Sequence, residues 1–339
     1  MTNRTVDCHT HILTREAMQL LAKESRSVTP VLKDLNERSA TLEIGGKVVQ
    51  RPLPCEIWEI GLRLRDMDAN GVDVQVLSPT VFTFFYDQEP ALALACATLQ
   101  NEEIAAVVRR YPGRFLGLGS VPLQAPQLAA VELERVMTQL DLRGAMIGTN
   151  VNGRNLDDPA LEPFWAHASS LGAFIFIHPH AAAAPERLSA YYLRNLIGLP
   201  VETTIAAACL VFGGVLDRHP RLKICLSHGG GFVPYQAGRF QHGWAVRSEP
   251  KAHLGHQPSE SLGRLFYDTI LHSKSALEFL VASAGPDRVL LGSDYPFDMG
   301  NVDCVARVNE LAIAAAARDH ILGGYAHKLF SRGAQNAHA

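Results

Sequence analysis

The chain of 339 residues lacks the features that mark several classes of protein. No apolar run reaches the roughly 18 to 20 residues that span a bilayer, so we expect no membrane segment. The start, MTNRTVDCHTH, has no apolar h-region and no small-residue cleavage site, so we expect no secretory signal. The net charge of -3 gives no electrostatic reason to expect nucleic acid or an anionic membrane as a partner.

Two kinds of motif are missing as well. The six cysteines include no CxxC pair, which argues against a disulfide framework and favours free thiols in a reducing cytoplasm. No GxGxxG follows an early strand-like segment, which disfavours a dinucleotide-binding open sheet. What remains is a chain with 47% apolar and 19% charged residues, a composition typical of a globular protein with a large core.

Eight short apolar segments have the composition of buried strands, and most are followed by a helix-compatible stretch. They lack clean alternation, as parallel strands do when helices cover both faces of a sheet. The segments are 4–8, 72–77, 115–120, 144–148, 173–177, 222–226, 265–269 and 288–291. Helical patterning is clearest over 90–111, 126–140 and 303–317. This alternation predicts an α/β fold, a (β/α)₈ TIM-like barrel, with a doubly wound open sheet as the competing interpretation.

Two stretches fall outside this alternation. Residues 13–60, between the first and second segments, have weak periodicity, and long insertions in a compact domain tend to form a lid or wall over a site. The end of the chain from Ser331 is small and polar. We therefore predict one barrel domain over 1–330 with a lid-like insertion at 13–60, followed by a tail over 331–339.

Residue types that commonly bind metal ions follow several of the predicted strands. In a barrel of this kind, the active site lies at the carboxyl ends of the strands. The first segment runs into DCHTH, where His9 and His11 are two apart and can face the same side of an extended chain. His178 follows the fifth segment, and Asp294 follows the eighth. Imidazole and carboxylate are good ligands for a borderline divalent ion. We predict that these four residues hold one divalent ion, with Zn²⁺ expected and Mn²⁺ as the alternative.

Each of these residues has a plainer explanation when it is taken alone. An HxH pair arises by chance, His178 could be a satisfied core histidine, and Asp294 could cap a helix. The coincidence at the ends of several strands of one barrel is what favours the metal site.

His228 follows the sixth segment and precedes three glycines, which permit close backbone approach and unusual dihedral angles. An imidazole with a pKa near neutrality suits a general acid or base beside a metal ion. The residues leave two other roles open, a fifth ligand and a group that orients the ligands from behind.

Two arginines, Arg51 in the insertion and Arg239 after the sixth segment, are candidates to bind an anion. A guanidinium pairs with a carboxylate through two parallel hydrogen bonds, so either residue would orient an acid substrate. On the residues alone, a solvated surface arginine is the plainer interpretation of both.

The motifs DxHxH, HPH, SHGGG and GSDYPF together resemble those of the amidohydrolase superfamily. Within it, the chain resembles the branch of metal-dependent decarboxylases typified by the 2-amino-3-carboxymuconate-6-semialdehyde decarboxylases. YPGRFLGLGSVPLQAP and HPRLKICLSHGGGFVPYQAGR read like landmarks of that branch, and the similarity runs over nearly the whole chain. A sister branch, that of the γ-resorcylate and 5-carboxyvanillate decarboxylases, opens with Glu in place of the first metal histidine. The DxHxH motif of this sequence matches the aminocarboxymuconate-semialdehyde branch.

The resemblance implies a role for each candidate residue. The four predicted ligands would bind a catalytic Zn²⁺, with Asp294 also counted as catalytic, and His228 would activate water and move protons. Arg51 would bind a carboxylate of the substrate, and Arg239 would do so from the neighbouring subunit of a homodimer. Phe297 would pack beside the ring or diene of the substrate.

The sequence departs from the family at the wall of the expected site. The family's HPW motif reads HPH here, which puts His180 in place of a tryptophan. A second tryptophan expected shortly afterwards is matched at best by Tyr191 or Tyr192. These differences leave the metal ligands untouched and make the identity of the substrate the open question.

The resemblance implies a non-oxidative decarboxylase of a small unsaturated or aromatic carboxylic acid, such as aminocarboxymuconate semialdehyde. The alternative is a metal-dependent hydrolase or hydratase acting on a related small acid, and the predicted carboxylate contact of Arg51 favours the decarboxylase. A non-catalytic barrel with a structural ion is disfavoured, because structural zinc sites are usually closed and rich in cysteine.

Overall fold

The computed structural model describes residues 4–25 and 29–331. At the centre of the fold is a ring of eight parallel strands. Every strand of the ring overlaps one of the predicted segments, so the predicted barrel is confirmed. The strands are β1 (Val6–Ile12), β5 (Val74–Pro79), β6 (Phe115–Gly117), β7 (Gly144–Gly148), β10 (Phe174–His178), β11 (Lys223–Leu226), β12 (Phe266–Asp268) and β13 (Val289–Leu290).

The ring closes through two short backbone bridges between two runs of paired strands. One run has the order β1-β5-β6 and the other β13-β12-β11-β10-β7. Gly119 bridges to Ala145 beyond the end of β6, and Thr10 of β1 bridges to Tyr295 beyond the end of β13. The amide of His11 donates to the carbonyl of Tyr295 at 2.8 Å. The second bridge therefore lies among the predicted site residues.

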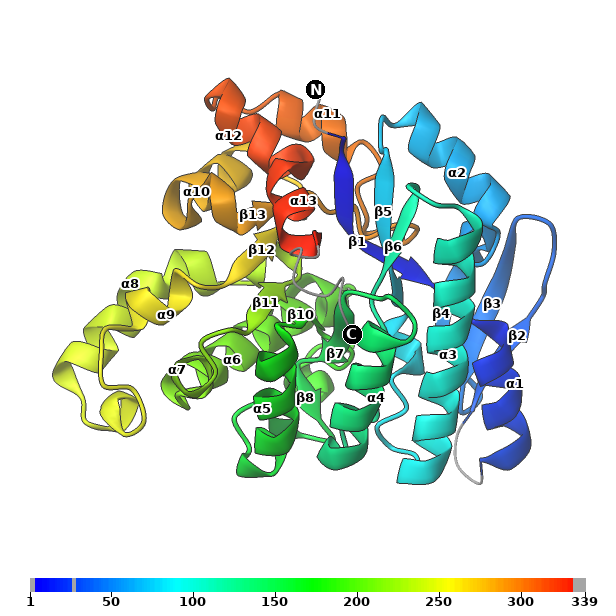
Figure 1. Ribbon diagram of the computed structural model, residues 1–339, viewed down its shortest axis with the longest axis horizontal. Helices are drawn as coiled ribbons and strands as arrows, with labels where there is room; N and C mark the ends of the chain where they lie inside the picture. Colours follow the sequence, from blue (N-terminus) through cyan, green and yellow to red (C-terminus); the bar gives the residue numbers. More distant parts are fainter. Residues whose placement is uncertain (1–3, 26–28, 332–339) are drawn as a thin grey trace, which may run out of the picture.

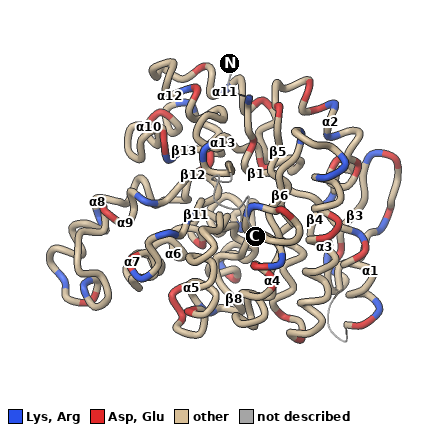
Figure 2. The backbone as a smooth tube through the Cα atoms, viewed as in Figure 1, with Lys and Arg blue, Asp and Glu red and all other residues tan. Residues whose placement is uncertain are grey.

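Helices surround the strands, with α8 (Val233–Val246) and α9 (Pro258–Leu262) extending away from the barrel at the left of Figure 1. The predicted helices at 90–111 and 126–140 are confirmed as α3 (Pro90–Arg110) and α4 (Pro126–Thr138). Acidic and basic residues are interspersed along the chain without a concentration of one sign (Figure 2). Helix α2 (Ile60–Ala69) precedes β5, the second strand of the ring. The helices that follow the second and later strands are α3, α4, α5 (Glu162–Leu171), α6 (Leu199–Phe212), α7 (Val215–Arg218), α8, α9, α10 (Lys274–Ala284), α11 (Cys304–Asn309), α12 (Ala315–Asp319) and α13 (Tyr325–Phe330).

The prediction of one helix over 303–317 was wrong, because the segment contains α11 and the start of α12 with a break between them. Leu311, in the break, is buried at 2% exposure, so the chain leaves the helical path to place that side chain in the core. The guanidinium of Arg318 donates to the carbonyl of Leu311 at 3.0 Å, which satisfies an acceptor that the break leaves outside a helix.

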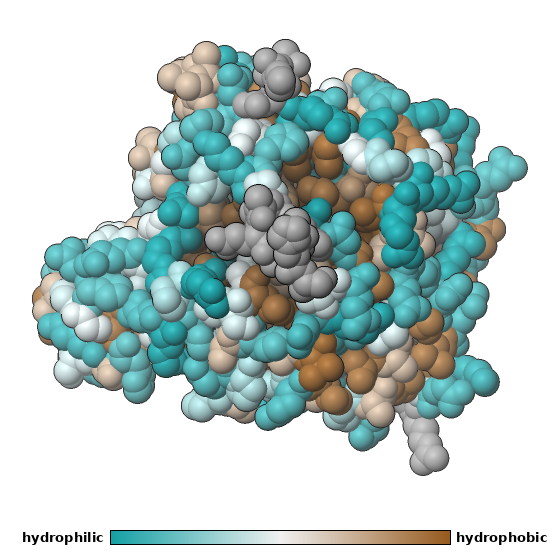
Figure 3. All heavy atoms as spheres, in the orientation of Figure 1, coloured by the Kyte–Doolittle hydropathy of each residue, from teal (hydrophilic) through white to brown (hydrophobic). Residues whose placement is uncertain are grey.

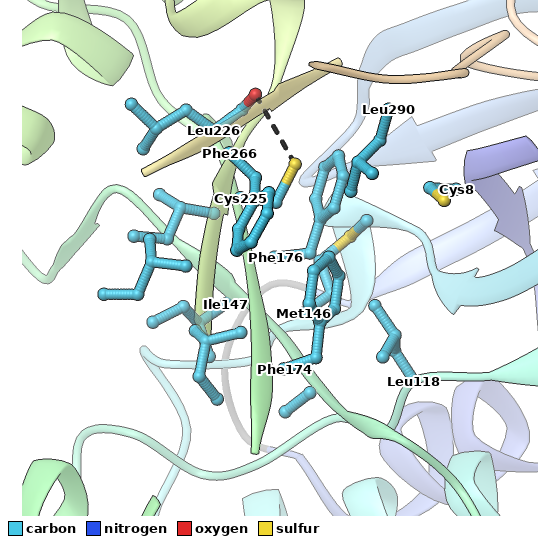
Figure 4. Close-up of a cluster of buried hydrophobic side chains, with 14 of the residues drawn as sticks. Cys8, Leu118, Met146, Ile147, Phe174, Phe176, Cys225, Leu226, Phe266 and Leu290 are labelled. Carbon is cyan, nitrogen blue, oxygen red and sulfur yellow. Dashed lines mark hydrogen bonds between the residues drawn. The ribbon is translucent and has the colours of Figure 1, made fainter. Parts of the chain in front are cut away.

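Hydrophobic side chains from strands all around the ring form one core, part of which Figure 4 shows. Along β10, Phe174, Phe176 and His178 alternate onto the same side of the strand. The ring centroid of Phe176 lies 4.8 Å from that of His9, and the ring of Phe174 lies 5.0 Å from Phe330 of α13. A column of rings therefore runs from the C-terminal helix to the underside of the predicted site.

The insertion between the first two barrel strands has its own secondary structure. It consists of α1 (Arg15–Glu24) and an antiparallel sheet of β2 (Pro30–Lys33), β3 (Ser39–Ile44) and β4 (Lys47–Pro54), beside one another at the right of Figure 1. A small core joins this sheet to the barrel, with Phe297 packed against it. The insertion therefore reaches the carboxyl ends of the barrel strands. Of the predicted tail, all but Ser331 lies outside the described residues.

Within residues 4–25 and 29–331, two helical stretches, Pro90–Arg110 and Arg194–Phe212, are long and apolar enough to cross a membrane by length and composition alone. A helix that covers barrel strands is apolar because it packs inside the protein. Helix α3 is such a helix, since it packs against α1, α4 and β6. On the face seen in Figure 3, hydrophilic residues predominate and hydrophobic ones are interspersed among them. These stretches by themselves therefore give weak support for a membrane segment.

The first residue of β7 allows a direct test of the strand pairing. Gly144 has a φ of +148°, and a Cβ at this position would lie 1.9 Å from the carbonyl oxygen of Phe174 on the neighbouring strand β10. We expect Gly144→Ala to lower the free energy of unfolding in urea by about 3 kcal/mol or more, because the clash is with backbone that cannot move aside.

Gly61 of α2 is the matched control, because a Cβ there would meet nothing within 4 Å. We expect Gly61→Ala to raise the free energy of unfolding by about 0.5 to 1 kcal/mol, as removal of a glycine from a helix does. Similar unfolding midpoints for Gly144→Ala and the wild type would contradict the pairing described for β7 and β10.

Candidate active site

The structure brings His9, His11, His178 and Asp294 together at the carboxyl end of the barrel. The Nε2 atoms of His9 and His11 lie 3.2 Å apart. Oδ1 of Asp294 lies 3.0 Å from Nε2 of His11 and 3.3 Å from Nε2 of His9. The ring centroid of His178 is 5.0 Å from that of His11 and 5.1 Å from that of His9. The four predicted ligands thus share one small, buried volume.

The other ring nitrogens of the three histidines face hydrogen-bond acceptors. Nδ1 of His9 lies 2.6 Å from a carboxylate oxygen of Asp268. Nδ1 of His11 lies 3.2 Å from the carbonyl of Pro79, and Nδ1 of His178 lies 2.9 Å from the carbonyl of Pro179. When each Nδ1 carries the proton and donates it to these acceptors, every Nε2 presents a lone pair.

This arrangement fits a divalent cation. With the protons on Nδ1, lone pairs of imidazole and carboxylate point at one another, which is unfavourable without positive charge between them. Nε2 of His178 and Oδ1 of Asp294 are also buried without a hydrogen-bond partner among the described residues, and an orphaned buried polar atom costs about 1 to 3 kcal/mol. Neutral imidazole and carboxylate are the donors that a borderline ion such as Zn²⁺ accepts.

His228 lies beside these four residues. Its Nε2 is 3.5 Å from Oδ2 of Asp294, and its Nδ1 is buried without a partner among the described residues. One ligand atom from each of His9, His178, His228 and Asp294 lies within 4.8 Å of the others. By this spacing His228 belongs to a set of four that does not include His11, so both the ligand role and the acid/base role predicted for His228 fit the geometry.

The backbone takes uncommon conformations at these positions. His228 has a φ of +54° and Asp294 a φ of +57°, in the left-handed region that costs a non-glycine residue about 1 to 3 kcal/mol. Gly231, after His228, has a φ of +62°, and a Cβ there would lie 2.2 Å from the carbonyl of Pro200. The expectation that the glycines permit unusual dihedral angles and close approach is confirmed. Asp294 does not cap a helix, which removes its plainer explanation.

Asp268, at the end of β12, was not among the predicted site residues. Besides the contact with His9, its carboxylate accepts hydrogen bonds from the amides of His228 at 2.9 Å and Gly229 at 2.8 Å. Burial alone would raise the pKa of Asp268, but the hydrogen bond with His9 lowers it below its usual value. Asp268 is therefore a buried anion that positions two site histidines. Its place at the end of a predicted strand was a usable signal.

Charge is unevenly shared within the cluster. Burial alone would lower the pKa of His9, but Asp294 and then Asp268 raise it to about 10. Burial lowers the pKa of His11, and it lowers that of His178 well below the usual value. In the chain by itself, both ring nitrogens of His9 therefore carry a proton at neutral pH. A metal ion at this position would take the place of the proton on Nε2.

A second buried network lies directly beneath the site. The guanidinium of Arg63 donates to the carbonyl of His11 and, at 3.1 Å, to Oε1 of Gln75. Gln75 in turn donates to Oδ2 of Asp7 at 3.2 Å, and Oγ of Ser293 donates to the same oxygen at 2.5 Å. This network joins the strand that carries both histidines to the segment that carries Asp294.

Two cavities meet at the site, one with a volume of about 510 Å³ and the other of about 290 Å³. His228 and Asp294 line both. The larger cavity is also walled by Val49 and Gln50 of the insertion and by Phe297, whose ring lies 5.1 Å from that of His11. A volume of this size accommodates a small organic acid.

The structure does not bring the two predicted arginines into these cavities. Arg51 is exposed on β4 and is absent from the cavity walls, although Val49 and Gln50 line the larger one. Arg239 is exposed on α8. Phe297 lines the larger cavity, and its packing beside the ring or diene of a substrate stays a prediction.

At the positions where the sequence departs from the family, His180 and Tyr192 line the larger cavity, whereas Tyr191 is 87% exposed and does not. The ring of His180 packs edge-on against Phe84 and Tyr86. Burial, followed by the charge of Arg194, lowers the pKa of His180 to about 4, so this imidazole is neutral at physiological pH.

Comparison with known proteins relates the whole barrel to one family. The family model described as "Amidohydrolase" matches residues 6–332. The chain is 37% identical over 325 residues to a 2-amino-3-carboxymuconate-6-semialdehyde decarboxylase of Dictyostelium discoideum, covering 95% of this chain and 90% of that protein. It is 30% identical to a γ-resorcylate decarboxylase of Polaromonas sp., covering 79% of this chain and 86% of that one.

A solved structure agrees with these relatives. The crystal structure of 5-carboxyvanillate decarboxylase from Sphingomonas paucimobilis superposes with a TM-score of 0.83 at 26% identity, covering 97% of this chain and 99% of that chain. All three of these proteins are decarboxylases by name.

The contact between Asp268 and His9 is open to a direct test. Asp268→Asn keeps the size of the side chain but removes the charge that holds the proton of Nδ1. We expect the affinity of the purified protein for Zn²⁺ to fall about 10- to 100-fold, as it does when the acceptor behind a metal-binding histidine is lost. Competition with a chromogenic chelator measures this affinity.

Asp319, an exposed carboxylate at the end of α12, supplies the control, and we expect Asp319→Asn to bind Zn²⁺ like the wild type. Equal affinities of Asp268→Asn and the wild type would show that Asp268 does not support a metal ligand.

Proposed function

The chain belongs to the amidohydrolase family, and from this premise we propose that it is a metal-dependent decarboxylase of a small unsaturated or aromatic carboxylic acid. The observation that carries the proposal is the buried cluster of His9, His11, His178 and Asp294, in which His178 and Asp294 line a cavity of about 510 Å³. The family and its decarboxylase branch, predicted from the motifs, are confirmed by the matches reported above.

We assign His9, His11, His178 and Asp294 as the ligands of the divalent ion. The opposed lone pairs and the two orphaned atoms support this set. Zn²⁺ suits the donors, and Mn²⁺ is the alternative. When bound, the ion supplies positive charge that stabilises the electron density left behind as CO₂ departs.

The residues of the chain account for the remaining requirements of the reaction. The bond that breaks joins the carboxylate to the adjacent carbon of the substrate. The electron pair stays on that adjacent carbon as CO₂ leaves, and the carbon must then be protonated. His228 lies at the junction of both cavities and next to Asp294, so we assign it as the group that moves this proton. Phe297 and Phe82 wall the larger cavity with apolar surface, where a ring or diene packs.

The substrate is proposed as a class. The relative from Dictyostelium discoideum is named for aminocarboxymuconate semialdehyde, an unsaturated acid, and the other two relatives are named for aromatic acids. The proposal is tested by incubating the metal-loaded protein with these three acids, following CO₂ release and ultraviolet absorbance together. A change in absorbance without CO₂ would indicate a hydrolase or hydratase instead.

We also propose a homodimer in which Arg239 of one subunit contributes to the site of the other. The helix α8 that carries Arg239 extends away from the barrel (Figure 1). Its surface exposes large apolar side chains, with Tyr235 at 78% and Val246 at 61% exposure, and Phe279 of α10 adds 47%. Exposed apolar side chains next to Arg239, which forms no ion pair among the described residues, favour a contact between subunits.

We propose a cytoplasmic location as well. The six cysteines are all free, which supports it.

His228→Ala separates the roles that remain open for this residue. We expect metal content near that of the wild type, because the four assigned ligands stay in place, and a loss of at least about 100-fold in kcat, because the proton donor is gone. Metal analysis of the purified variant and steady-state kinetics measure the two quantities. Loss of the metal together with activity would identify His228 as a ligand.

Mixed dimers test whether a site is shared between subunits. Arg239→Ala subunits keep a complete metal cluster, and His228→Ala subunits keep a complete Arg239. In a mixed dimer, one of the two sites is intact only if Arg239 comes from the partner. We expect neither variant alone to be active and the refolded mixture to regain part of the wild-type activity. Verified mixed dimers without recovered activity would contradict a shared site.

A further inference from the structure

One guanidinium borders the site that no sequence motif indicated. Arg194 lines the larger cavity, and it is the only lysine or arginine among the described residues that line either of the two cavities. It is the first residue of a π-helical turn, Arg194–Gly198, that leads into α6. Single π-helical turns are rare and occur frequently at functional sites.

The charge of Arg194 has no compensating carboxylate in the part of the chain that the structure describes. No carboxylate lies within 4.0 Å of its guanidinium among the described residues. Its one recorded hydrogen bond, from Nη2 to the carbonyl of His180, is long at 3.4 Å. A guanidinium has five N–H donors, so most of those of Arg194 remain available to a ligand in the cavity.

The backbone before Arg194 is held in an uncommon form. Tyr191 and Tyr192 have φ values of +55° and +60°, two successive non-glycine residues in the left-handed region. Each costs about 1 to 3 kcal/mol, and such residues cluster at ligand-binding positions. The turn directs the chain so that Tyr192, Arg194 and Asn195 all line the same cavity.

We propose that Arg194 binds a second anionic group of the substrate, and hence that the enzyme prefers acids with two carboxylates over acids with one. This inference rests on the proposed decarboxylase function. The carboxylate that is lost lies at the metal ligands, and the one that stays pairs with Arg194. Asp298, which shares the cavity wall, repels a second anion, and Arg194 is the one permanently charged partner that the described residues of this subunit offer it there.

The experiment compares two unreactive probes, isophthalate with two carboxylates and benzoate with one. Their binding to the metal-loaded wild type, Arg194→Gln and Arg194→Lys is measured by titration calorimetry. Arg194 is exposed, so we expect the wild type to bind isophthalate about three- to fivefold more tightly than benzoate, as one ion pair at an exposed guanidinium permits. We expect Arg194→Gln to lose this preference with benzoate affinity unchanged, and Arg194→Lys to keep part of it.

Arg187→Gln is the matched control, because Arg187 is an exposed arginine of the same segment that does not line the cavity. We expect it to retain the preference of the wild type. Thermal unfolding of each variant verifies that the fold is intact, and Arg194→Lys provides the comparison if Arg194→Gln is unstable.

Three results overturn the inference: equal binding of both probes by the wild type, an undiminished preference in Arg194→Gln, or an equal loss for both probes. The binding measurement needs no turnover, so the two proposals fail separately. A protein that releases no CO₂ from any acid but prefers isophthalate through Arg194 refutes the decarboxylase alone. Decarboxylation with a preference that ignores Arg194 refutes this inference alone.

Discussion

The candidate active site depends on the backbone contact that closes the barrel between β1 and the segment after β13. The amide of Asp294 donates to the carbonyl of His9, and the amide of His11 donates to the carbonyl of Tyr295, both at 2.8 Å. These two bonds place a carboxylate from the end of the chain's last barrel strand within reach of two imidazoles from its first. Without them the four ligands would be divided between two separate edges of a sheet. The fold and the site are therefore stabilised by the same hydrogen bonds.

This closure brings together backbone strain and electrostatic repulsion between lone pairs, and neighbouring contacts must offset both. Asp294 and His228 adopt left-handed backbone conformations, and several nitrogen and oxygen lone pairs meet in a buried volume. Asp268 holds two of the site histidines in place. Its carboxylate contacts the ring of His9 and accepts a hydrogen bond from the backbone amide of His228. Strain of this kind persists only where neighbouring contacts fix the geometry. A bound cation would remove the electrostatic part of the cost, so metal binding and stability should be linked.

The sequence predicts the barrel and the inner part of the site for a simple reason. Strand position determines which side chains reach the carboxyl end of a barrel, and DxHxH, HPH and GSDYPF fall at strand ends. Asp268 obeys the same rule, but a lone aspartate carries no motif. Arg194 could not be found in this way, because its place on the cavity wall depends on two left-handed residues and a π-helical turn that no periodicity reveals. For Arg51 the family resemblance supplied a role, whereas the exposed side chain on β4 does not line the cavity of this subunit.

The chemistry and the choice of substrate therefore depend on different parts of the chain. The strand ends supply the imidazoles and carboxylates that any member of the barrel can use for metal-assisted chemistry, and function is then determined by what surrounds them. Here the surroundings come from β4, from the turn that carries Tyr192 and Arg194, and from Phe297. None of these three is part of the ring of strands, so each can change without disturbing the closure that holds the ligands. An uncompensated guanidinium on such a wall costs little stability, because it stays solvated until a ligand arrives. It also adds the charge that distinguishes one acid from another.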